Sequence, residues 1–484
     1  MLFNSIEFLI FIPIVFTVYW FILNKSLTLQ NLFIVIISYV FYGWWDFRFL
    51  GLMALTTLLS YLSGLLIKKF SSNRARQKLV STLNVLINLG ILGYYKYFNF
   101  FAESLEELLI SIGYKPDWIT LDIILPVGIS FYTFQALSYS IDVFNKKIEP
   151  TRDIVSFFAY VSFFPQLVAG PIERATNLLP QFYKKRNFNY TDARDGLRQI
   201  LWGFFKKMVI ADNCSQIVNE IFSNYQNINS SGLFIGGVLF AFQIYGDFSG
   251  YSDIAIGLAK LFGIHIMNNF NFPYFSRNIA EFWKRWHISL TTWFRDYLYI
   301  PLGGSRLGKY ITIRNTMIIF IVSGIWHGAN WTFVIWGLYN ALLFLPLLLV
   351  NKTKIHKESI AYNRFFPSLI EIVQVLFTFF LVVIGWIFFR SSSVDVAFDY
   401  ISRIFSFEIF EIPHIPGSKK ILFYSLFSIF FMLVFEWSCR TKQFGFDIKA
   451  IIRNRKVRWC VYILVIWLIL ELGGTQQSFI YFQF

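Results

Sequence analysis

Apolar runs of about 20 residues recur along the whole 484-residue chain, and each run is long enough to cross the hydrocarbon core of a bilayer as a helix. Hydrophobic residues make up 56% of the chain and charged residues only 15%. Because soluble domains carry about a quarter charged residues, this composition excludes an ordinary soluble protein. We therefore predict an all-α, polytopic integral membrane protein. The alternating segments of about 10 residues that mark an outer-membrane barrel are not seen in the sequence.

The apolar runs set the predicted spans. We expect about eleven true crossings, with the remaining segments re-entrant or interfacial, in a single integral membrane domain over residues 1–484. The first run has neither a basic n-region nor a small-residue cleavage site, so we expect it to be a retained span rather than a signal peptide. The candidate spans are 2–23, 29–44, 49–67, 79–98, 121–144, 154–170, 199–217, 232–263, 312–327, 331–350, 369–389, 420–437 and 459–473.

The net charge of +15 is compatible with nucleic-acid binding. However, lysine and arginine collect in short segments between the apolar runs, as they do in the cytoplasmic loops of membrane proteins. We therefore expect the lipid bilayer, and no nucleic acid, as a partner. The basic segments 68–78 and 277–314 are predicted to be cytoplasmic. The three cysteines form no C-x-x-C motif, and their spacing indicates neither a metal site nor a disulfide framework.

One predicted span is broken by its own sequence. The stretch "SFFPQLVAGPIER" (162–174) contains two prolines and a glycine. Irregular backbone at membrane depth is tolerated only where it lies against protein or a water-filled cavity. We interpret the stretch as part of a re-entrant hairpin, and the alternative is a plain kinked span.

His327 ends a long apolar run, in "SGIWHGANW" (323–331). A histidine at membrane depth is costly and normally faces a bundle interior or a cavity. Its unperturbed pKa near 6.5 suits proton abstraction at neutral pH. The alternative is a histidine that is hydrogen-bonded between helices and serves packing alone.

His287 lies in "EFWKRWHISLTTWFRDYLYIPLGGSR" (281–306), which predicts an amphipathic helix at the cytoplasmic interface. At helical spacing its aromatic and leucine residues form one stripe, and Lys284, His287, Thr291 and Arg295 form another. The basic stripe faces either lipid phosphates, as a plain anchor, or the phosphates of a soluble donor. On the second interpretation, the candidate donor-binding residues are Lys284, Arg285, Trp286, Arg295, Asp296 and Arg306.

A third polar cluster lies in "FQIYGDFSGYSDIAIG" (242–257), where Asp247, Ser249, Ser252 and Asp253 interrupt an apolar run. Two carboxylates inside a span are expensive and indicate a wet cavity. We regard Asp247 and Ser249 as candidate substrate-binding residues, although ion-coupled transport would use such residues too. The chain contains neither a G-x-S-x-G nucleophile motif nor an H-E-x-x-H metal motif.

The motifs together resemble the membrane-bound O-acyltransferase family. "FWKRWHISLTTWFRDYLYIPLGGSR" (282–306), followed by the histidine of "SGIWHGANWTFVIWG" (323–337), carries the resemblance. The motifs resemble those of the bacterial branch that acetylates alginate and peptidoglycan. The resemblance runs from residue 1 to about residue 390 and is weaker over 391–484, which we expect to add C-terminal spans. Further matching motifs are "MLFNSIEFLIF" (1–11), "SYVFYGWWDFRFL" (38–50), "LPVGISFYTFQALSYSIDVF" (125–144), "FFPQLVAGPIER" (163–174) and "YGDFSGYSDIAIG" (245–257).

The resemblance implies a helical fold with a central tunnel through the membrane. It implies that His327 corresponds to the family's invariant histidine, the presumed catalytic residue. It also implies that His287 occupies the upstream His/Asn position, which has a supporting or donor-side role. Asn330, Trp326 or backbone amides are our candidates for stabilising the oxyanion.

The leading hypothesis is therefore an O-acetyltransferase in the cytoplasmic membrane of a bacterium. It would take acetyl groups from acetyl-CoA in the cytoplasm, without a permanently bound cofactor, and supply them to an extracytoplasmic polysaccharide. A separate periplasmic or surface O-acetyltransferase partner is expected. D-alanyl transfer to teichoic acid is an alternative in the same family. A transporter or flippase for lipid-linked sugars and a non-catalytic scaffold are alternatives of other classes.

Overall fold

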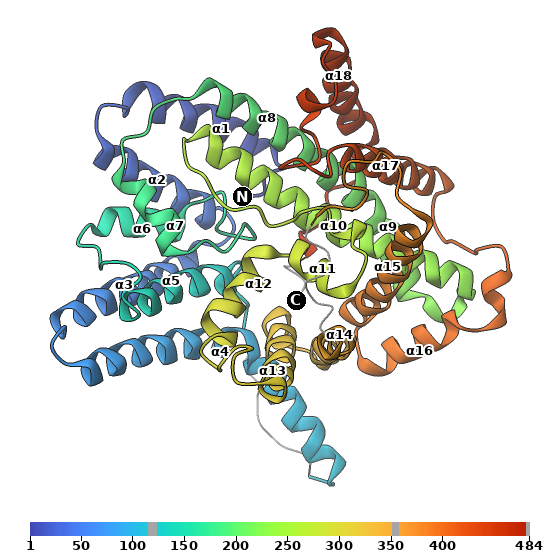
Figure 1. Ribbon diagram of the computed structural model, residues 1–484, viewed down its shortest axis with the longest axis horizontal. Coiled ribbons are helices and arrows are strands. Elements are labelled where there is room, and N and C mark those ends of the chain that lie inside the picture. Colours follow the sequence, from blue (N-terminus) through green and yellow to red (C-terminus); the bar gives the residue numbers. More distant parts are fainter. Residues whose placement is uncertain (115–122, 351–357, 481–484) are drawn as a thin grey trace. The chain divides into compact units, whose positions relative to one another are not determined.

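The structure is a computed structural model that describes residues 1–114, 123–350 and 358–480. Every regular element among these residues is a helix, which confirms the all-α prediction (Figure 1). By their internal contacts, the residues form two compact units. Unit 1 is Met1–Asn189 with Leu261–Ile266, and unit 2 is Tyr190–Lys260 with Met267–Phe484. The single domain that we expected from the sequence stays a prediction.

Helices of unit 1 begin where polar residues cap apolar runs. Ser5, Ser26, Asn73 and Asp153 each accept a hydrogen bond from a backbone N–H in the first turn of the helix that follows. The elements are α1 (Ile6–Thr17), η1 (Val18–Ile22), α2 (Leu27–Gly43), η2 (Phe47–Phe49), α3 (Leu50–Lys69), α4 (Arg74–Ser111), α5 (Ile129–Phe144), α6 (Ile154–Ser162), α7 (Ala175–Leu178) and η3 (Leu179–Tyr183).

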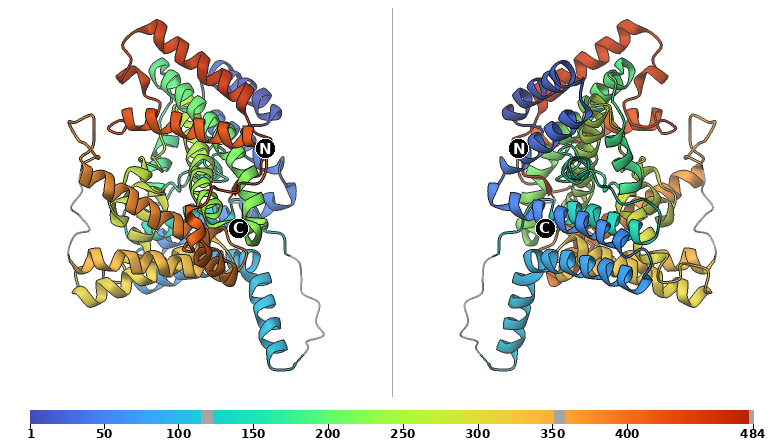
Figure 2. Two further views of the ribbon diagram at one scale, coloured as in Figure 1. Left: turned by 90° about the vertical axis from the view of Figure 1, so that its right-hand side faces the viewer. Right: turned by 90° about the vertical axis from the view of Figure 1, so that its left-hand side faces the viewer.

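Helix α4 is much longer than the predicted span 79–98, with 38 residues. Its first part packs against α3 and α5. In Figure 2 its C-terminal part extends away from those two helices. The predicted span 121–144 is helical only from Ile129 onward, and its first two residues lie outside the described part of the chain.

The break predicted at 162–174 is confirmed, because α6 ends at Ser162 and the next helix begins at Ala175. Side chains satisfy the backbone around this buried segment. Gln135 and Gln166 both donate to the carbonyl oxygen of Tyr160, at 2.7 and 3.1 Å. This arrangement meets the rule that irregular backbone at membrane depth must be satisfied by protein. Whether the segment is re-entrant stays a prediction.

Unit 2 contains the two unusual histidines and the longest run of helices. Figure 1 shows it in green to red. Its elements are α8 (Tyr190–Phe204), η4 (Phe205–Ala211), α9 (Asp212–Ser223), η5 (Tyr225–Asn227), α10 (Ser230–Leu261, of which the last residue belongs to unit 1), η6 (Pro273–Phe275), α11 (Ile279–Arg285), α12 (Ile288–Phe294), η7 (Arg295–Tyr299), α13 (Lys309–His327), α14 (Trp331–Leu349), α15 (Leu369–Arg390), α16 (Val394–Ile404), η8 (Phe407–Phe410), α17 (Lys419–Ser438), η9 (Ile448–Ala450) and α18 (Arg455–Leu472).

Five helical segments of the described residues are both long and apolar enough to cross a membrane: Phe47–Lys69, Ser230–Leu261, Trp331–Leu349, Leu369–Arg390 and Lys419–Ser438. They agree with a multi-pass protein. The total of about eleven crossings stays a prediction. Ser230–Leu261 is the most deeply buried of the five. Because it is surrounded by protein, its polar side chains are protected from lipid and can form a site.

Candidate active site

His327 is the last residue of α13, directly before the sharp turn into α14. Small residues let these two helices pack closely. A Cβ on Gly324 would collide with the carbonyl group of Phe333, and a Cβ on Gly337 would collide with that of Phe320. The tight hairpin places His327 inside unit 2, where the residue is 4% exposed.

Aromatic rings surround the His327 side chain. The ring centroids of Trp326 and Trp336 both lie 5.0 Å from that of His327, and the Phe389 centroid lies 5.3 Å away. Trp386, which belongs to α15, stacks on Trp336 of α14 with an interplanar angle of 20°. These rings restrict both the orientation of the imidazole and the access of bulk water to it.

The structure contradicts the single amphipathic helix that we predicted around His287. Helix α11 ends at Arg285, α12 begins at Ile288, and His287 between them has a φ of +43°, in the left-handed region. The preceding loop explains the break. The N–H of Ile288 donates to the carbonyl oxygen of Asn269, and the N–H of Asn271 donates to that of Arg285, each at 2.9 Å. Helical periodicity cannot reveal these tertiary contacts.

The break turns His287 into the protein. The predicted polar stripe is therefore wrong for this residue, because Lys284 and Arg295 are exposed whereas His287 is 1% exposed. Its ring centroid lies 4.7 Å from that of Phe248 and 6.0 Å from that of Trp326. Burial lowers the pKa of His287, which lies outside the candidate spans, to about 3. The imidazole is therefore neutral at physiological pH.

His287 and His327 meet in unit 2. Their ring centroids lie 6.4 Å apart, with an interplanar angle of 58°. The structure thus brings together the two histidines that the sequence singled out, although His287 lies between α11 and α12 and His327 ends α13.

A buried ion pair joins η4 to α10. Lys206 Nζ lies 2.6 Å from Asp253 Oδ2 and donates to Ser249 Oγ at 2.8 Å. Ser249, a predicted substrate-binding residue, is 1% exposed and also donates to the carbonyl oxygen of Tyr245. Sequence reasoning found the two α10 residues but missed the lysine. The sequence feature that could have revealed Lys206 is the pair of adjacent lysines inside the apolar run 199–217.

The second lysine of that pair forms another buried cluster. Lys207 Nζ lies 2.8 Å from Asp212 Oδ1 and 2.9 Å from Asp247 Oδ1. It also donates to the carbonyl oxygen of Gln477, and Asp247 Oδ2 accepts from the N–H of Ile480 at 2.7 Å. Asp247, predicted to bind substrate, is therefore part of the contact that holds the segment after α18 in unit 2.

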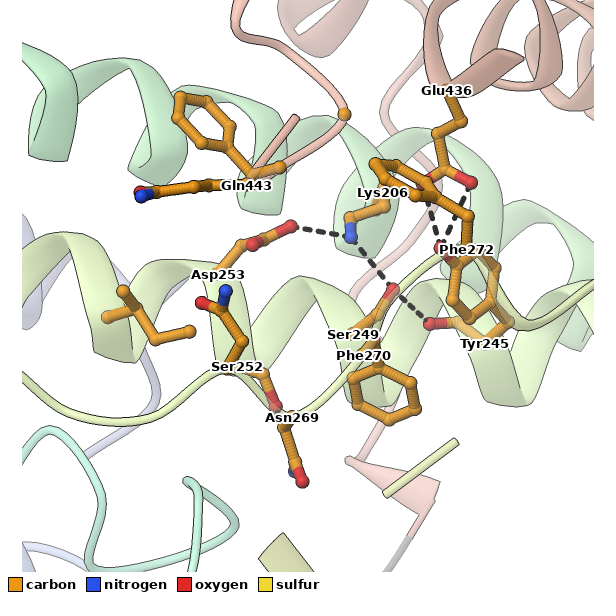
Figure 3. Close-up of a pocket in the computed structure, with 14 residues that line it drawn as sticks. Lys206, Tyr245, Ser249, Ser252, Asp253, Asn269, Phe270, Phe272, Glu436 and Gln443 are labelled. Atoms are coloured by element: carbon orange, nitrogen blue, oxygen red, sulfur yellow. Dashed lines mark hydrogen bonds and ion pairs between the residues drawn. The ribbon is translucent and has the colours of Figure 1, made fainter. Parts of the chain in front are cut away.

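A small polar pocket lies beside the first of these clusters (Figure 3). Tyr245 donates to both carboxylate oxygens of Glu436, at 2.9 Å each, and Glu436 is 2% exposed. Figure 3 shows Asp253 and Lys206 joined on one side of the pocket and Tyr245 and Glu436 on another. The main polar lining is Lys206, Tyr245, Ser249, Asp253, Asn269 and Glu436. Of the two carboxylates from which the sequence predicted a wet cavity, Asp253 lines this pocket and Asp247 does not. The presence of water in it stays a prediction.

Three of the predicted donor-binding residues, Lys284, Arg295 and Arg306, are exposed. Arg295 Nε lies 2.8 Å from the carboxylate of Asp296. Trp286, by contrast, is 1% exposed and packs in the core of unit 2. The exposed members face solvent, whereas Trp286 stabilises the fold around the site.

Two further predicted residues have structural contacts. Arg285 is buried, and its guanidinium lies 2.6 Å from Glu281. Asn330 caps α14, because its side-chain oxygen accepts from the N–H of Thr332 at 2.9 Å and its amide nitrogen donates to the carbonyl oxygen of Ser392 at 3.0 Å. In the part of the chain that the structure describes, no cluster of His, Cys, Asp or Glu is arranged to hold a metal ion.

Comparison with known proteins decides the family. The family model of the membrane-bound O-acyltransferases matches residues 40–389, well over half of the chain. The chain belongs to the membrane-bound O-acyltransferase family. It is therefore a multi-pass membrane enzyme of the O-acyltransferase class, and the transporter and scaffold hypotheses lose their basis. The match includes both His287 and His327.

Individual relatives indicate which branch of the family this chain resembles. The chain is 40% identical over 408 residues to a probable alginate O-acetylase of Azotobacter vinelandii, covering 84% of this chain and 78% of that protein. It is 35% identical over 427 residues to the peptidoglycan O-acetyltransferase of Helicobacter pylori, covering 82% and 78%. A teichoic acid D-alanyltransferase of Bacillus subtilis is 29% identical over 275 residues, covering 54% and 68%. The similarity thus favours the acetylating branch of the family.

Proposed function

We propose that this membrane-bound O-acyltransferase moves acetyl groups from acetyl-CoA in the cytoplasm to an extracytoplasmic polysaccharide in a bacterium. The observation that carries the proposal is the pair of buried imidazoles, His287 and His327, whose ring centroids lie 6.4 Å apart. The extensive similarity to an alginate O-acetylase and a peptidoglycan O-acetyltransferase supports acetyl as the acyl group. We propose the cytoplasmic membrane as its location, because acetyl-CoA is a cytoplasmic donor.

In the proposed reaction, His327 acts as the general base. It takes the proton of the attacking hydroxyl group, whose oxygen forms a bond to the thioester carbonyl carbon as the carbon–sulfur bond breaks. The proton then passes to the departing thiolate. The aromatic rings around His327 limit hydrolysis by keeping bulk water from the thioester. We propose Trp326 as the oxyanion donor in preference to Asn330, because both polar atoms of the Asn330 side chain already have partners.

The donor is proposed to bind from the cytoplasmic side. The exposed side chains of Lys284, Arg295 and Arg306 lie in the basic region 277–314, which suits the phosphates of coenzyme A. The polar pocket beside Lys206 offers hydrogen-bonding groups inside the protein. We further propose that a separate periplasmic or surface O-acetyltransferase receives the acetyl group or presents the polysaccharide.

D-alanyl transfer to teichoic acid is the second candidate. Its support is the similarity to the Bacillus subtilis enzyme, which covers only 54% of this chain. The similarity to the alginate O-acetylase and the peptidoglycan O-acetyltransferase covers 84% and 82% of this chain, at 40% and 35% identity. Acetyl transfer is therefore favoured.

The test uses purified protein in proteoliposomes with a de-O-acetylated polysaccharide as the hydroxyl acceptor, supplied with radiolabelled acetyl-CoA or, in parallel, with a D-alanyl carrier protein and teichoic acid. The His327→Ala variant serves as the control. The proposal expects release of free coenzyme A from acetyl-CoA by the wild type and little release by the variant. Turnover of the D-alanyl carrier alone would favour the second candidate, and turnover of neither donor would contradict both.

A further inference from the structure

Asn269 lies between the polar pocket and His287. It belongs to the loop between α10 and α11, lines the pocket, and is 1% exposed (Figure 3). Its side-chain oxygen lies 3.1 Å from His287 Nδ1. Its amide nitrogen donates to Ser252 Oγ at 3.3 Å. One side chain therefore connects the pocket to the histidine.

The surrounding hydrogen bonds fix which way the Asn269 amide points. The backbone N–H of Ser289, which can only donate, lies 3.2 Å from the atom assigned as Oδ1. The Ser289 hydroxyl donates to the same atom at 2.9 Å. Because an amide NH₂ cannot accept the bond from the backbone N–H, the atom that faces His287 must be the carbonyl oxygen.

This orientation fixes the tautomer of His287. A carbonyl oxygen accepts and never donates, so the hydrogen in the 3.1 Å contact must come from His287 Nδ1. In a neutral imidazole the other nitrogen, Nε2, then carries the lone pair. We propose that Asn269 is a positioning residue that holds His287 as the Nδ1–H tautomer, so that Nε2 accepts a hydrogen bond or a proton during acyl transfer. The inference rests on the proposed function.

The backbone of Asn269 has a second part in this positioning. Its carbonyl oxygen accepts from the N–H of Ile288 at 2.9 Å, next to the left-handed His287. Residues other than glycine rarely adopt a positive φ, and the surrounding structure must hold them there. Asn269 thus restrains both the backbone and the ring of His287. The Asn269 side chain provides the shorter of two contacts to Nδ1, since the Ser289 hydroxyl lies 3.4 Å from the same atom. A substitution of Asn269 can remove its side-chain contact while leaving the backbone contact in place.

The test compares three variants with the wild type in the acetyl-CoA assay. Asn269→Leu is nearly the same size but has no acceptor, whereas Asn269→Asp keeps an acceptor for Nδ1–H. Asn271→Leu, at an exposed position of the same loop, is the matched control. We expect Asn269→Leu to lower kcat by about 10- to 100-fold, as is typical when a histidine loses its orienting partner. Asn269→Asp should recover most of this loss, and Asn271→Leu should match the wild type.

A pH profile separates positioning from a merely structural role. A carboxylate beside Nδ1 favours the imidazolium form, so Asn269→Asp should move the acidic limb of kcat to higher pH. The other titratable groups near this contact are the same in each variant. They are His327 on the ring side and Lys206, Tyr245, Asp253 and Glu436 on the pocket side. Equal protein amounts in the membrane, checked by immunoblot, exclude misfolding.

Two outcomes would overturn the inference. One is wild-type kcat in Asn269→Leu. The other is equal loss in the Leu and Asp variants with an unchanged pH profile, which would indicate a packing role. Either result, with His327→Ala still inactive, leaves the proposed function standing. If the wild type itself fails to consume acetyl-CoA, the proposed function fails instead.

Discussion

The imidazole rings of His287 and His327 lie 6.4 Å apart between centroids, although 40 positions separate the two residues in the chain. One ring follows a break between two short helices, and the other ends α13 at a tight hairpin. Both are nearly inaccessible to solvent. Their convergence, in a region matched by an O-acyltransferase family model, makes the pair the centre of the proposed chemistry.

The neutral state of His287 predicts a pH dependence of stability. Burial lowers its pKa to about 3 in the folded protein, whereas the unfolded chain has a value near 6.5. Below about pH 6.5 the unfolded state therefore binds a proton that the folded state does not. The free energy of unfolding then decreases as the pH is lowered, by up to about 1.4 kcal/mol per pH unit. His287→Gln should show a smaller decrease in Tm between pH 7.5 and 5, measured in detergent. Parallel curves for the two proteins would contradict this account.

Removing the charge of Lys206 should destabilise the protein. The variant Lys206→Met leaves the buried carboxylate of Asp253 without the ammonium that lies 2.6 Å away. Breaking a buried ion pair on one side costs about 3–5 kcal/mol. We expect a lower Tm and less protein in the membrane. Lys78→Met, at an exposed position, is the control.

The double variant Lys206→Met/Asp253→Leu sharpens this test. Replacing both members of a buried pair with apolar residues is often nearly neutral. The double variant should therefore be more stable than Lys206→Met alone. If it is less stable than the single variant, the cost comes from packing around η4 and not from an uncompensated charge.

The α13–α14 hairpin should not tolerate a larger residue at position 324. A Cβ on Gly324 would collide with the backbone of Phe333, and overpacking of this kind costs about 1–3 kcal/mol. Because His327 lies in the next turn, Gly324→Ala should also lower acyl transfer. Gly90→Ala is the matched control, since no heavy atom lies within 4 Å of its added Cβ. Equal activities of the two variants would show that the hairpin contact does not position His327.

Much of the fold follows from the sequence because long apolar runs form helices by local chemistry. The predicted spans 331–350, 369–389 and 420–437 correspond to α14, α15 and α17 within one residue at each end. Polar N-cap residues such as Asn330 and Ser368 mark two of these starts. A helix boundary inside an apolar run was also predictable where proline and glycine interrupt it, as at 162–174.

The geometry of the site was less predictable, because tertiary contacts decide it. The stripe around His287 has continuous helical periodicity, but the helix is broken there. The backbone carbonyl of Asn269 accepts from Ile288, and the backbone N–H of Asn271 donates to Arg285. The paired lysines Lys206 and Lys207 resemble a loop charge. However, Lys206 is buried and Lys207 is largely buried, and each forms an ion pair with a carboxylate of α10. A sequence pattern carries no information about such distant partners.

The central claim, that His327 carries acyl transfer to an extracytoplasmic polysaccharide, is tested most directly by one measurement. It is the acetate released by mild base from cell-envelope polysaccharides of the wild type, a deletion strain, and the strain carrying His327→Ala. The immunoblot must show the variant in the membrane. The account predicts that ester-linked acetate disappears in both mutant strains, because a general base contributes about 10²- to 10⁴-fold to the rate. Wild-type acetate in the His327→Ala strain would contradict it and leave this histidine a packing residue.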